Sequence, residues 1–154
     1  MPTTCDMIVL CCVGSEIADI CSASQRIAHR SAFVTSPFYP GRYPPDSECV
    51  CSFMTDSNQR LLVRVAADSM LEWKPSCSSD VLVVYDGSEL ALARCGHLPV
   101  GLNITSRTHA ILVALRTDRR LQYKGFWIVV EGTNCATHSR ISLTVWLRLT
   151  RESA

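Results

Sequence analysis

The chain lacks the short motifs that mark the common hydrolases and nucleotide-binding enzymes. It contains no Gly-x-Ser-x-Gly, no His-Glu-x-x-His and no glycine-rich phosphate loop. None of its four histidines, His29, His97, His109 and His138, has a nucleophile or carboxylate partner at a recognisable spacing. We therefore expect a protein without catalytic activity, either complete in itself or a module taken from a larger protease or receptor.

The chain also lacks a charge excess and a long apolar run. The formal net charge is +1, with acids and bases interspersed, so no basic footprint for nucleic acid or anionic membrane is present. No stretch approaches the roughly 20 apolar residues of a membrane-spanning helix, and we expect no membrane span. A length of 154 residues fits one domain.

No segment keeps an apolar period of 3.6 residues, so helices are not indicated. Runs of strand length alternate instead with turn residues, which predicts an all-β fold and specifically a β-sandwich. Between residues 36 and 45 four prolines predict an extended, turn-rich surface segment. The expected strands are Leu61–Val65, Val81–Tyr85, Ala110–Leu115 and Gly125–Val130.

Nine cysteines are many for a chain of this size, and none belongs to a Cys-x-x-Cys pair. Zinc sites use close ligand pairs, and only Cys49/Cys51 and Cys95/His97 approach that spacing. Spread cysteines between strands favour a disulfide framework and an oxidising, secreted setting. An odd number leaves at least one thiol unpaired or intermolecular. An intracellular, thiol-rich protein that binds zinc or senses redox state is the alternative.

The first 20 residues are expected to form a weak signal peptide or leader. Met7 to Gly14 is a short apolar run of the kind found in signal peptides. The residues before it carry Asp6 and no lysine or arginine, whereas a signal peptide begins with positive charge.

Five motifs in order resemble the CUB domain of extracellular proteins, over residues 21–131. Ser36-Pro37-Phe38-Tyr39-Pro40 is similar to the family's Ser-Pro-Asn-Tyr-Pro signature, and Tyr43-Pro44 follows it ahead of Cys49. Cys77-Ser-Ser-Asp80 resembles the family's Cys-x-x-Asp, with a Tyr-Asp-Gly turn after it. Cys95-Gly96 and Lys124-Gly125-Phe126 match the fourth cysteine and the start of the last strand.

The resemblance implies a jelly-roll-like sandwich of two antiparallel sheets, stapled by Cys21–Cys49 and Cys77–Cys95. Cys21 lacks the glycine that usually follows the first cysteine. Cys51 stands where the family usually has tryptophan, and we expect it to be a small buried residue or an aberrant thiol.

Calcium-binding members of the family supply three acids, and the matching positions here hold Glu72, Asp80 and Asp118. Tyr43 matches the tyrosine that orients one of them. The resemblance therefore implies a weak Ca²⁺ site, whose carboxylates also pair with a lysine or arginine of an extracellular protein partner; a glycan is the alternative ligand. Taken singly, each acid could instead be a solvated loop residue.

Three features lie beside this assignment. Trp73 is either an aromatic anchor at the rim of the site or half-buried packing. Asn103-Ile104-Thr105 is an N-glycosylation sequon, expected in an exposed turn. Residues 132–154 form a tail outside the resemblance; Ile141–Leu149 alternates like an extra apolar strand, and Cys135 adds a thiol, but a disordered or aberrantly spliced tail is favoured.

Overall fold

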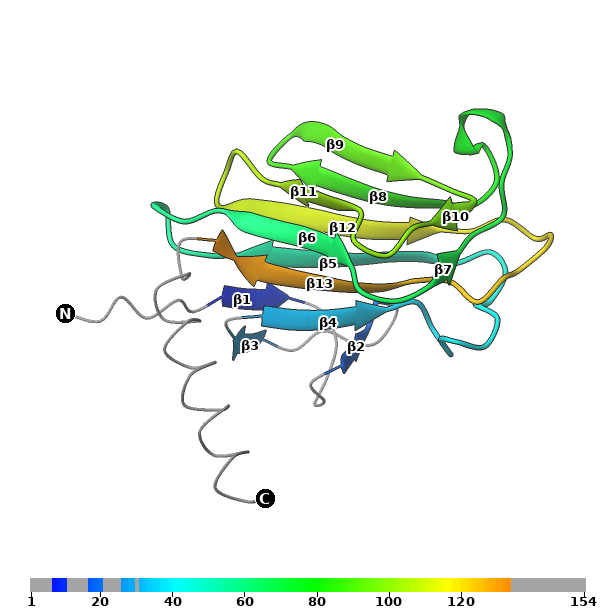
Figure 1. Cartoon of the computed structure of the whole chain (residues 1–154), viewed down its shortest axis with the longest axis horizontal. Coiled ribbons are helices and arrows are strands. Elements are labelled where there is room, and N and C mark those ends of the chain that lie inside the picture. Colours follow the sequence, from blue (N-terminus) through cyan, green and yellow to red (C-terminus); the bar gives the residue numbers. More distant parts are fainter. Residues whose placement is uncertain (1–6, 11–16, 21–25, 30, 134–154) are drawn as a thin grey trace, which may run out of the picture.

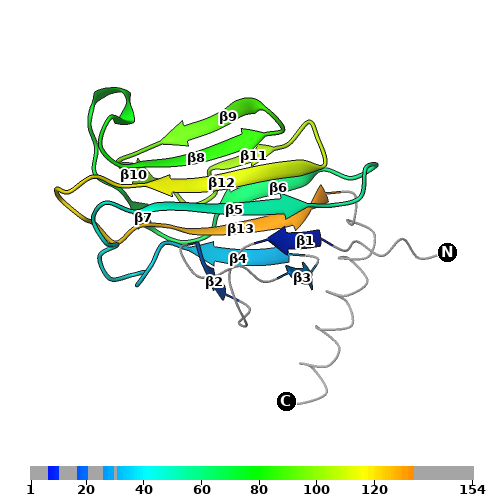
Figure 2. The same cartoon turned by 180° about the vertical axis from the view of Figure 1, so that it is seen from behind.

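The computed structural model describes residues 7–10, 17–20, 26–29 and 31–133 as a β-sandwich (Figure 1). Two larger sheets face each other, and the opposite view shows the same layers from behind (Figure 2). In spatial order the six-stranded sheet contains β3 (Arg26–His29), β1 (Met7–Leu10), β5 (Glu48–Met54), β12 (Ala110–Arg116), β8 (Val81–Asp86) and β9 (Glu89–Arg94).

The second sheet has five strands, and a short two-stranded sheet lies at one end of the sandwich. In spatial order the five-stranded sheet contains β11 (Asn103–Thr105), β6 (Leu61–Val65), β13 (Trp127–Gly132), β4 (Ser31–Thr35) and β2 (Ile17–Asp19). β10 (His97–Leu98) pairs with β7 (Ser69–Met70), and Pro75–Cys77 forms a single 3₁₀ turn. All pairings are antiparallel except that of β2 with β4. No helix in the described residues is long and apolar enough to cross a membrane.

The expected all-β sandwich is confirmed, and its core follows from the alternation of apolar residues. β6 buries every second residue, and β12 does the same, so each strand presents one apolar face to the opposite sheet. The largest side chains between the sheets that are almost fully buried include Phe53, Phe126, Leu61, Leu115 and Ile128.

The Ser36-Pro37 and Gly125-Phe126 motifs meet in space. Ser36 Oγ accepts a hydrogen bond from Phe126 N at 3.0 Å, and Ser36 N donates to Phe126 O at 3.1 Å. Gly125 has a φ of +80°, and a Cβ built there would lie 1.7 Å from Ser36 Oγ. Glycine is therefore required both by conformation and by the closeness of Ser36.

Three sequence predictions change or gain detail in the structure. Asn103 is exposed as predicted, but it lies in the short edge strand β11 and not in a turn. Cys51 is fully buried as predicted, but it is disulfide-bonded and not a thiol. Met7–Leu10, expected within a leader, forms β1 and pairs with β5. Most of the predicted tail, from residue 134 onward and including Cys135, lies outside the described residues, as does Cys21, the predicted partner of Cys49.

Candidate metal site

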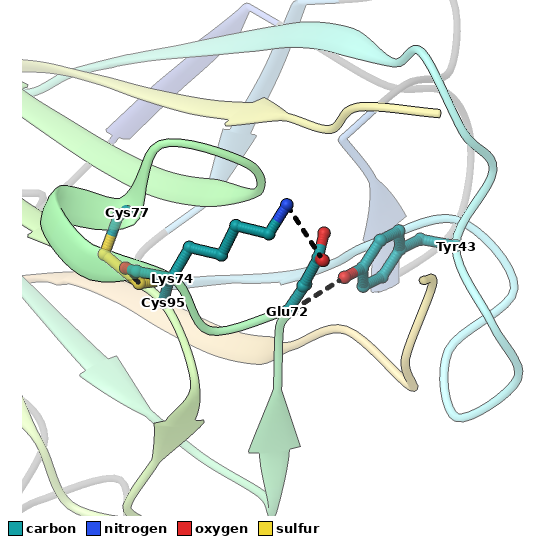
Figure 3. The surroundings of a disulfide bond; sticks show 5 residues. All are labelled: Tyr43, Glu72, Lys74, Cys77 and Cys95. Carbon is teal, nitrogen blue, oxygen red and sulfur yellow. Dashed lines mark hydrogen bonds and ion pairs between the residues drawn. A yellow bond between two sulfur atoms is a disulfide. The ribbon is translucent and has the colours of Figure 1, made fainter. Parts of the chain in front are cut away.

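The segment that follows β7 is held at both ends. Leu71 N donates to Gly96 O at 3.0 Å, and Cys77 N donates to Lys74 O at 2.9 Å. A disulfide joins Cys77 to Cys95, with 5.5 Å between their Cα atoms (Figure 3). The backbone of Glu72 and Lys74 is thereby fixed against the neighbouring β10 region.

Side chains along this segment alternate in direction. Glu72 is 2% exposed and points inward, whereas Trp73 is 65% exposed. The Trp73 ring lies against Gly96, since a Cβ on that glycine would come within 3.0 Å of Trp73 Cδ1. Trp73 is therefore not half-buried as one of the two predictions had it, and its role as an aromatic anchor stays a prediction.

Asp80 is brought beside Asp118 by strand register. β12 is antiparallel to β8 and pairs Arg116 with Val81, so the residue before β8 lies next to the residues after β12. Asp118 N continues the contact by donating to Asp80 Oδ1 at 2.8 Å. Asp80 is fully buried, which excludes the alternative that it is a solvated loop residue.

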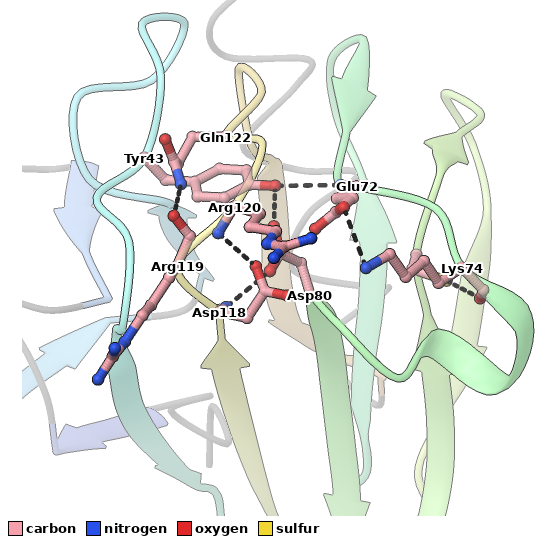
Figure 4. Close-up of polar contacts among 9 residues, drawn as sticks. Tyr43, Glu72, Lys74, Asp80, Asp118, Arg119, Arg120 and Gln122 are labelled. Carbon is pink, nitrogen blue, oxygen red and sulfur yellow. Dashed lines mark hydrogen bonds and ion pairs between the residues drawn. The ribbon is translucent and has the colours of Figure 1, made fainter.

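Tyr43 ties the Asp80 carboxylate to the Glu72 segment. Its hydroxyl donates to Asp80 Oδ2 at 2.5 Å and accepts from Glu72 N at 3.0 Å (Figure 4). Tyr43 is itself 1% exposed. One buried hydroxyl thus fixes the distance between two of the three acids, the kind of outer contact that orients ligand carboxylates.

The three carboxylates form one cluster. Glu72, Asp80 and Asp118 each offer an oxygen, and these oxygens lie within 4.8 Å of one another. Oxygens bound to a single Ca²⁺ at about 2.3–2.6 Å can be separated by up to about 5 Å across the ion. Glu72 Oε2 is buried without a hydrogen-bond partner, and such an atom is costly unless something binds it. The donor set and the orphan oxygen fit a hard cation.

The environment shifts the pKa values of the clustered groups in different directions. Burial raises the pKa of Asp80, against the opposing effect of the Tyr43 and Asp118 donors. The Arg120 backbone N–H, which donates to Asp118 Oδ1 at 2.8 Å, lowers the pKa of Asp118. Burial also raises the pKa of the Tyr43 hydroxyl, which therefore stays protonated and able to donate.

Lys74 is a neighbour of the cluster that sequence reasoning did not include. Its Nζ lies 3.7 Å from Glu72 Oε1. The signal was available, because residues two apart in an extended segment share a side and Lys74 is two residues after Glu72. The positive charge of Lys74 therefore partly neutralises the negative charge of the three carboxylates.

The bonding state of the cysteines distinguishes the predicted disulfides from the alternative of a zinc site. Cys77 and Cys95 form the disulfide expected from the resemblance. Cys49 and Cys51 each take part in a disulfide bond as well. These four residues hold no thiolate for zinc in this structure.

Comparison with known proteins places the chain in a family. A family model described as CUB domain matches residues 21–129. The chain belongs to the CUB domain family. Human cubilin is 27% identical to this CUB chain over 107 residues. The match covers 64% of this chain and 3% of cubilin. CUB domains occur in extracellular multidomain proteins, where they mediate protein–protein interaction and are in general not catalytic.

Solved structures agree with the CUB assignment. The full extracellular region of zebrafish Gpr126/Adgrg6 shares 28% identity and a TM-score of 0.63, covering 68% of this chain and 14% of that one. The CUB2 domain of MASP-1 bound to Ca²⁺ shares 24% identity and a TM-score of 0.62, covering 67% of this chain and 93% of that one. The second likeness shows the fold alone.

Proposed function

We propose that the chain is a secreted CUB binding module in which a Ca²⁺ ion, held by Glu72, Asp80 and Asp118, prepares a surface for a basic side chain of a protein partner. The observation that carries the proposal is the orphan Glu72 Oε2, buried in a cluster of three carboxylates. The Ca²⁺ bound to the CUB2 domain of MASP-1 adds support from a protein of the same fold.

The roles of the residues follow from their positions. Tyr43 and Asp118 N hold the Asp80 carboxylate in one orientation, so little reorganisation is needed when a cation arrives. Glu72 contributes the unpartnered oxygen. The ion supplies positive charge that cancels the repulsion among the three carboxylates and links the loops that carry them. We expect weak affinity, roughly 10⁻⁴–10⁻³ M, as in other extracellular modules.

Recognition would use what the ion leaves uncovered. Asp118 is the least buried of the three acids and can pair with a lysine or arginine of a partner by a charge-assisted hydrogen bond. The exposed Trp73 projects to the side of the segment opposite Glu72, so the carboxylates alone hold the partner side chain. The binding is directional, because the loop that carries Glu72 is fixed by the disulfide.

Secretion and glycosylation belong to the same proposal. Disulfide bonds at Cys49, Cys51, Cys77 and Cys95 are those of an oxidising compartment. Asn103 is exposed on β11, where its Nδ2 donates to Gly101 O at 2.8 Å and a glycan would extend into solvent. We expect Asn103 to be glycosylated in a secreted product.

The test of the metal is thermal unfolding at increasing Ca²⁺. For a dissociation constant in the stated range, about 5 mM Ca²⁺ stabilises the folded state by roughly 1–2 kcal/mol, or a few degrees in Tm. Asp118→Asn should abolish the shift. Glu89→Gln, which neutralises an exposed acid on β9, should keep it. No shift for the wild-type chain at 5 mM Ca²⁺ would sink the metal site.

Recognition of a basic side chain by the proposed site is tested separately from metal binding. In NMR titrations with lysine methyl ester we expect shift changes at Glu72 and Asp118 with Ca²⁺ and none with EDTA. Equal changes in both conditions, or none in either, would contradict recognition through the metal site while leaving metal binding itself untouched.

A further inference from the structure

Lys74 is the counter-ion nearest to the acidic cluster. Among the residues that the structure describes, its contact with Glu72 is the one ion pair that any of the three acids makes. The Glu72 side chain is 3% exposed and the Lys74 side chain 43%. The carboxylate is thus buried, whereas the ammonium group reaches it from the solvent side.

The position of Lys74 is imposed by the backbone. Lys74 is extended, with φ −143° and ψ 158°, immediately before the 3₁₀ turn that leads to Cys77. Glu72 and Lys74 therefore project to the same side and Trp73 to the other. Figure 3 shows the Lys74 side chain extended toward Glu72, with the Cys77–Cys95 disulfide beside its backbone.

The charge of Lys74 reaches beyond Glu72. Burial is the main influence on the pKa of Asp80 and raises it, and the Arg120 N–H is the main influence on Asp118 and lowers it. Lys74 acts on both carboxyls in the downward direction, because a positive charge favours their ionised forms. One ammonium group is therefore shared electrostatically by three carboxylates.

We propose that Lys74 is a built-in counter-ion that holds the cluster together without metal and that Ca²⁺ must displace in order to bind. The inference rests on the proposed calcium site and adds a competitor that belongs to the chain itself. It predicts opposite effects of Lys74 on the two states: Lys74 stabilises the metal-free domain and weakens the affinity for the metal.

Displacement follows from distance and charge. A Ca²⁺ ion ligated by Glu72 Oε2 at about 2.4 Å and an ammonium group 3.7 Å from Glu72 Oε1 would lie at most roughly 8 Å apart, a distance at which two like charges repel each other in a poorly hydrated site. Lys74 can leave at little cost, because its side chain is partly solvated and makes no other ion pair in the described part of the chain. The ammonium group moves into water when the metal enters.

The experiment compares Lys74→Gln, which removes the charge and leaves a polar side chain one atom shorter, with the wild-type chain. Calcium affinity is measured by isothermal titration and Tm with EDTA or with 5 mM Ca²⁺. We expect Lys74→Gln to bind Ca²⁺ about tenfold more tightly. Its Tm should be below that of the wild type in EDTA and equal or above it in Ca²⁺. Lys74→Arg, which keeps the charge, should retain the wild-type affinity.

Lys124→Gln is the matched control. Lys124 has a similarly exposed side chain and pairs with Asp68, not with the cluster. We expect its calcium affinity to stay within twofold of the wild type. An equal gain in Lys124→Gln would assign the effect to net charge and overturn the role of Lys74.

The outcomes separate the two proposals. If the wild type binds Ca²⁺ and Lys74→Gln binds with equal or lower affinity, the counter-ion inference is wrong and the calcium site stands. If neither protein binds, the calcium site itself is wrong and the inference falls with it. Binding by Lys74→Gln alone would support displacement and overturn calcium binding by the natural chain.

Discussion

Asp86, in the Tyr85-Asp86-Gly87 turn, organises a loop that has no part in the proposed metal site. Its Oδ2 accepts from Arg107 N at 2.5 Å, and its Oδ1 accepts from Thr108 N at 3.1 Å and Thr108 Oγ1 at 2.5 Å. Burial would raise the pKa of this carboxyl, but these donors outweigh burial and lower it below the ordinary value of 3.8. The ionised form is therefore favoured by folding.

We expect Asp86→Asn to lower the free energy of unfolding by about 1 kcal/mol at pH 7, because an amide accepts with only one oxygen. The sign of the pH dependence follows from the lowered pKa. The contribution of Asp86 is complete above pH 3.8 and is lost as the pH falls through the folded-state value.

Urea denaturation of both proteins between pH 7 and pH 2.5 measures this difference. The gap between wild type and Asp86→Asn should narrow only below pH 3.8. If the difference in the free energy of unfolding stayed constant down to pH 2.5, the effect of Asp86→Asn would come from altered packing and not from the lost charge.

At the proposed metal site, the sequence indicated candidate residues but not their burial. The positions of Glu72, Asp80 and Asp118 come from a family resemblance, and their clustering is consistent with it. That Asp80 is fully buried depends on the register of β12 against β8, a long-range contact without a local signal. The ion pair of Lys74 was overlooked because the motif defines only the acids.

At the scale of elements, strands were predictable where they lie in the middle of a sheet. Leu61–Val65 matches β6, and the predictions for β8 and β12 end one residue early. Glu89–Arg94 was missed because β9 is an edge strand whose residues are nearly all exposed. An edge strand on the surface has no need of apolar alternation.

Two strands show how turns and cysteines obscured the pattern. The last strand was predicted from Gly125, yet β13 begins at Trp127, because Gly125 adopts a positive φ and Phe126 bonds to Ser36. Glu48–Met54 was missed because Cys49 was assigned to a disulfide, and its alternation with Cys51 and Phe53 along one inward face of a strand was not considered.

The junction of β13 with the Ser36 turn gives the prediction for Gly125→Ala. The added methyl group would overlap Ser36 Oγ, and the positive φ is unfavourable for alanine. We expect a loss of about 3 kcal/mol or more in the free energy of unfolding, from overlap and the broken Phe126 N–H bond together. Urea denaturation measures it.

Gly101→Ala is the matched control for that measurement. Gly101 also has a positive φ, but nothing lies within 4 Å of the position of its Cβ. It should lose only the conformational part, about 1 kcal/mol. Equal losses in the two variants would show that Ser36 does not determine the cost.

For the whole molecule, disulfide bonds add to the stability that burial of the apolar core provides. Replacing both Cys77 and Cys95 by alanine should lower the free energy of unfolding by about 3 kcal/mol, since the bond closes a loop with a sequence separation of 18 residues. Urea denaturation without reductant measures this loss.

The remaining bonds provide the control. Because Cys49 and Cys51 are also disulfide-bonded, dithiothreitol should destabilise the double variant further. No effect of reductant on the double variant would mean that the Cys77–Cys95 bond alone staples the domain. If the double variant were as stable as the wild type, the Cys77–Cys95 bond would not contribute to stability.

The pairing of β1 has a consequence for polymerisation. Ile8, Val9 and Leu10 lie opposite Met54, Phe53 and Ser52, so the first strand of the chain covers one edge of β5. Proteolysis after residue 10 would remove that cover and expose backbone N–H and C=O groups along β5. Such an edge accepts an extended segment of another chain by β-augmentation. Cleavage near the N-terminus would thereby leave the β5 edge open to a strand of another chain.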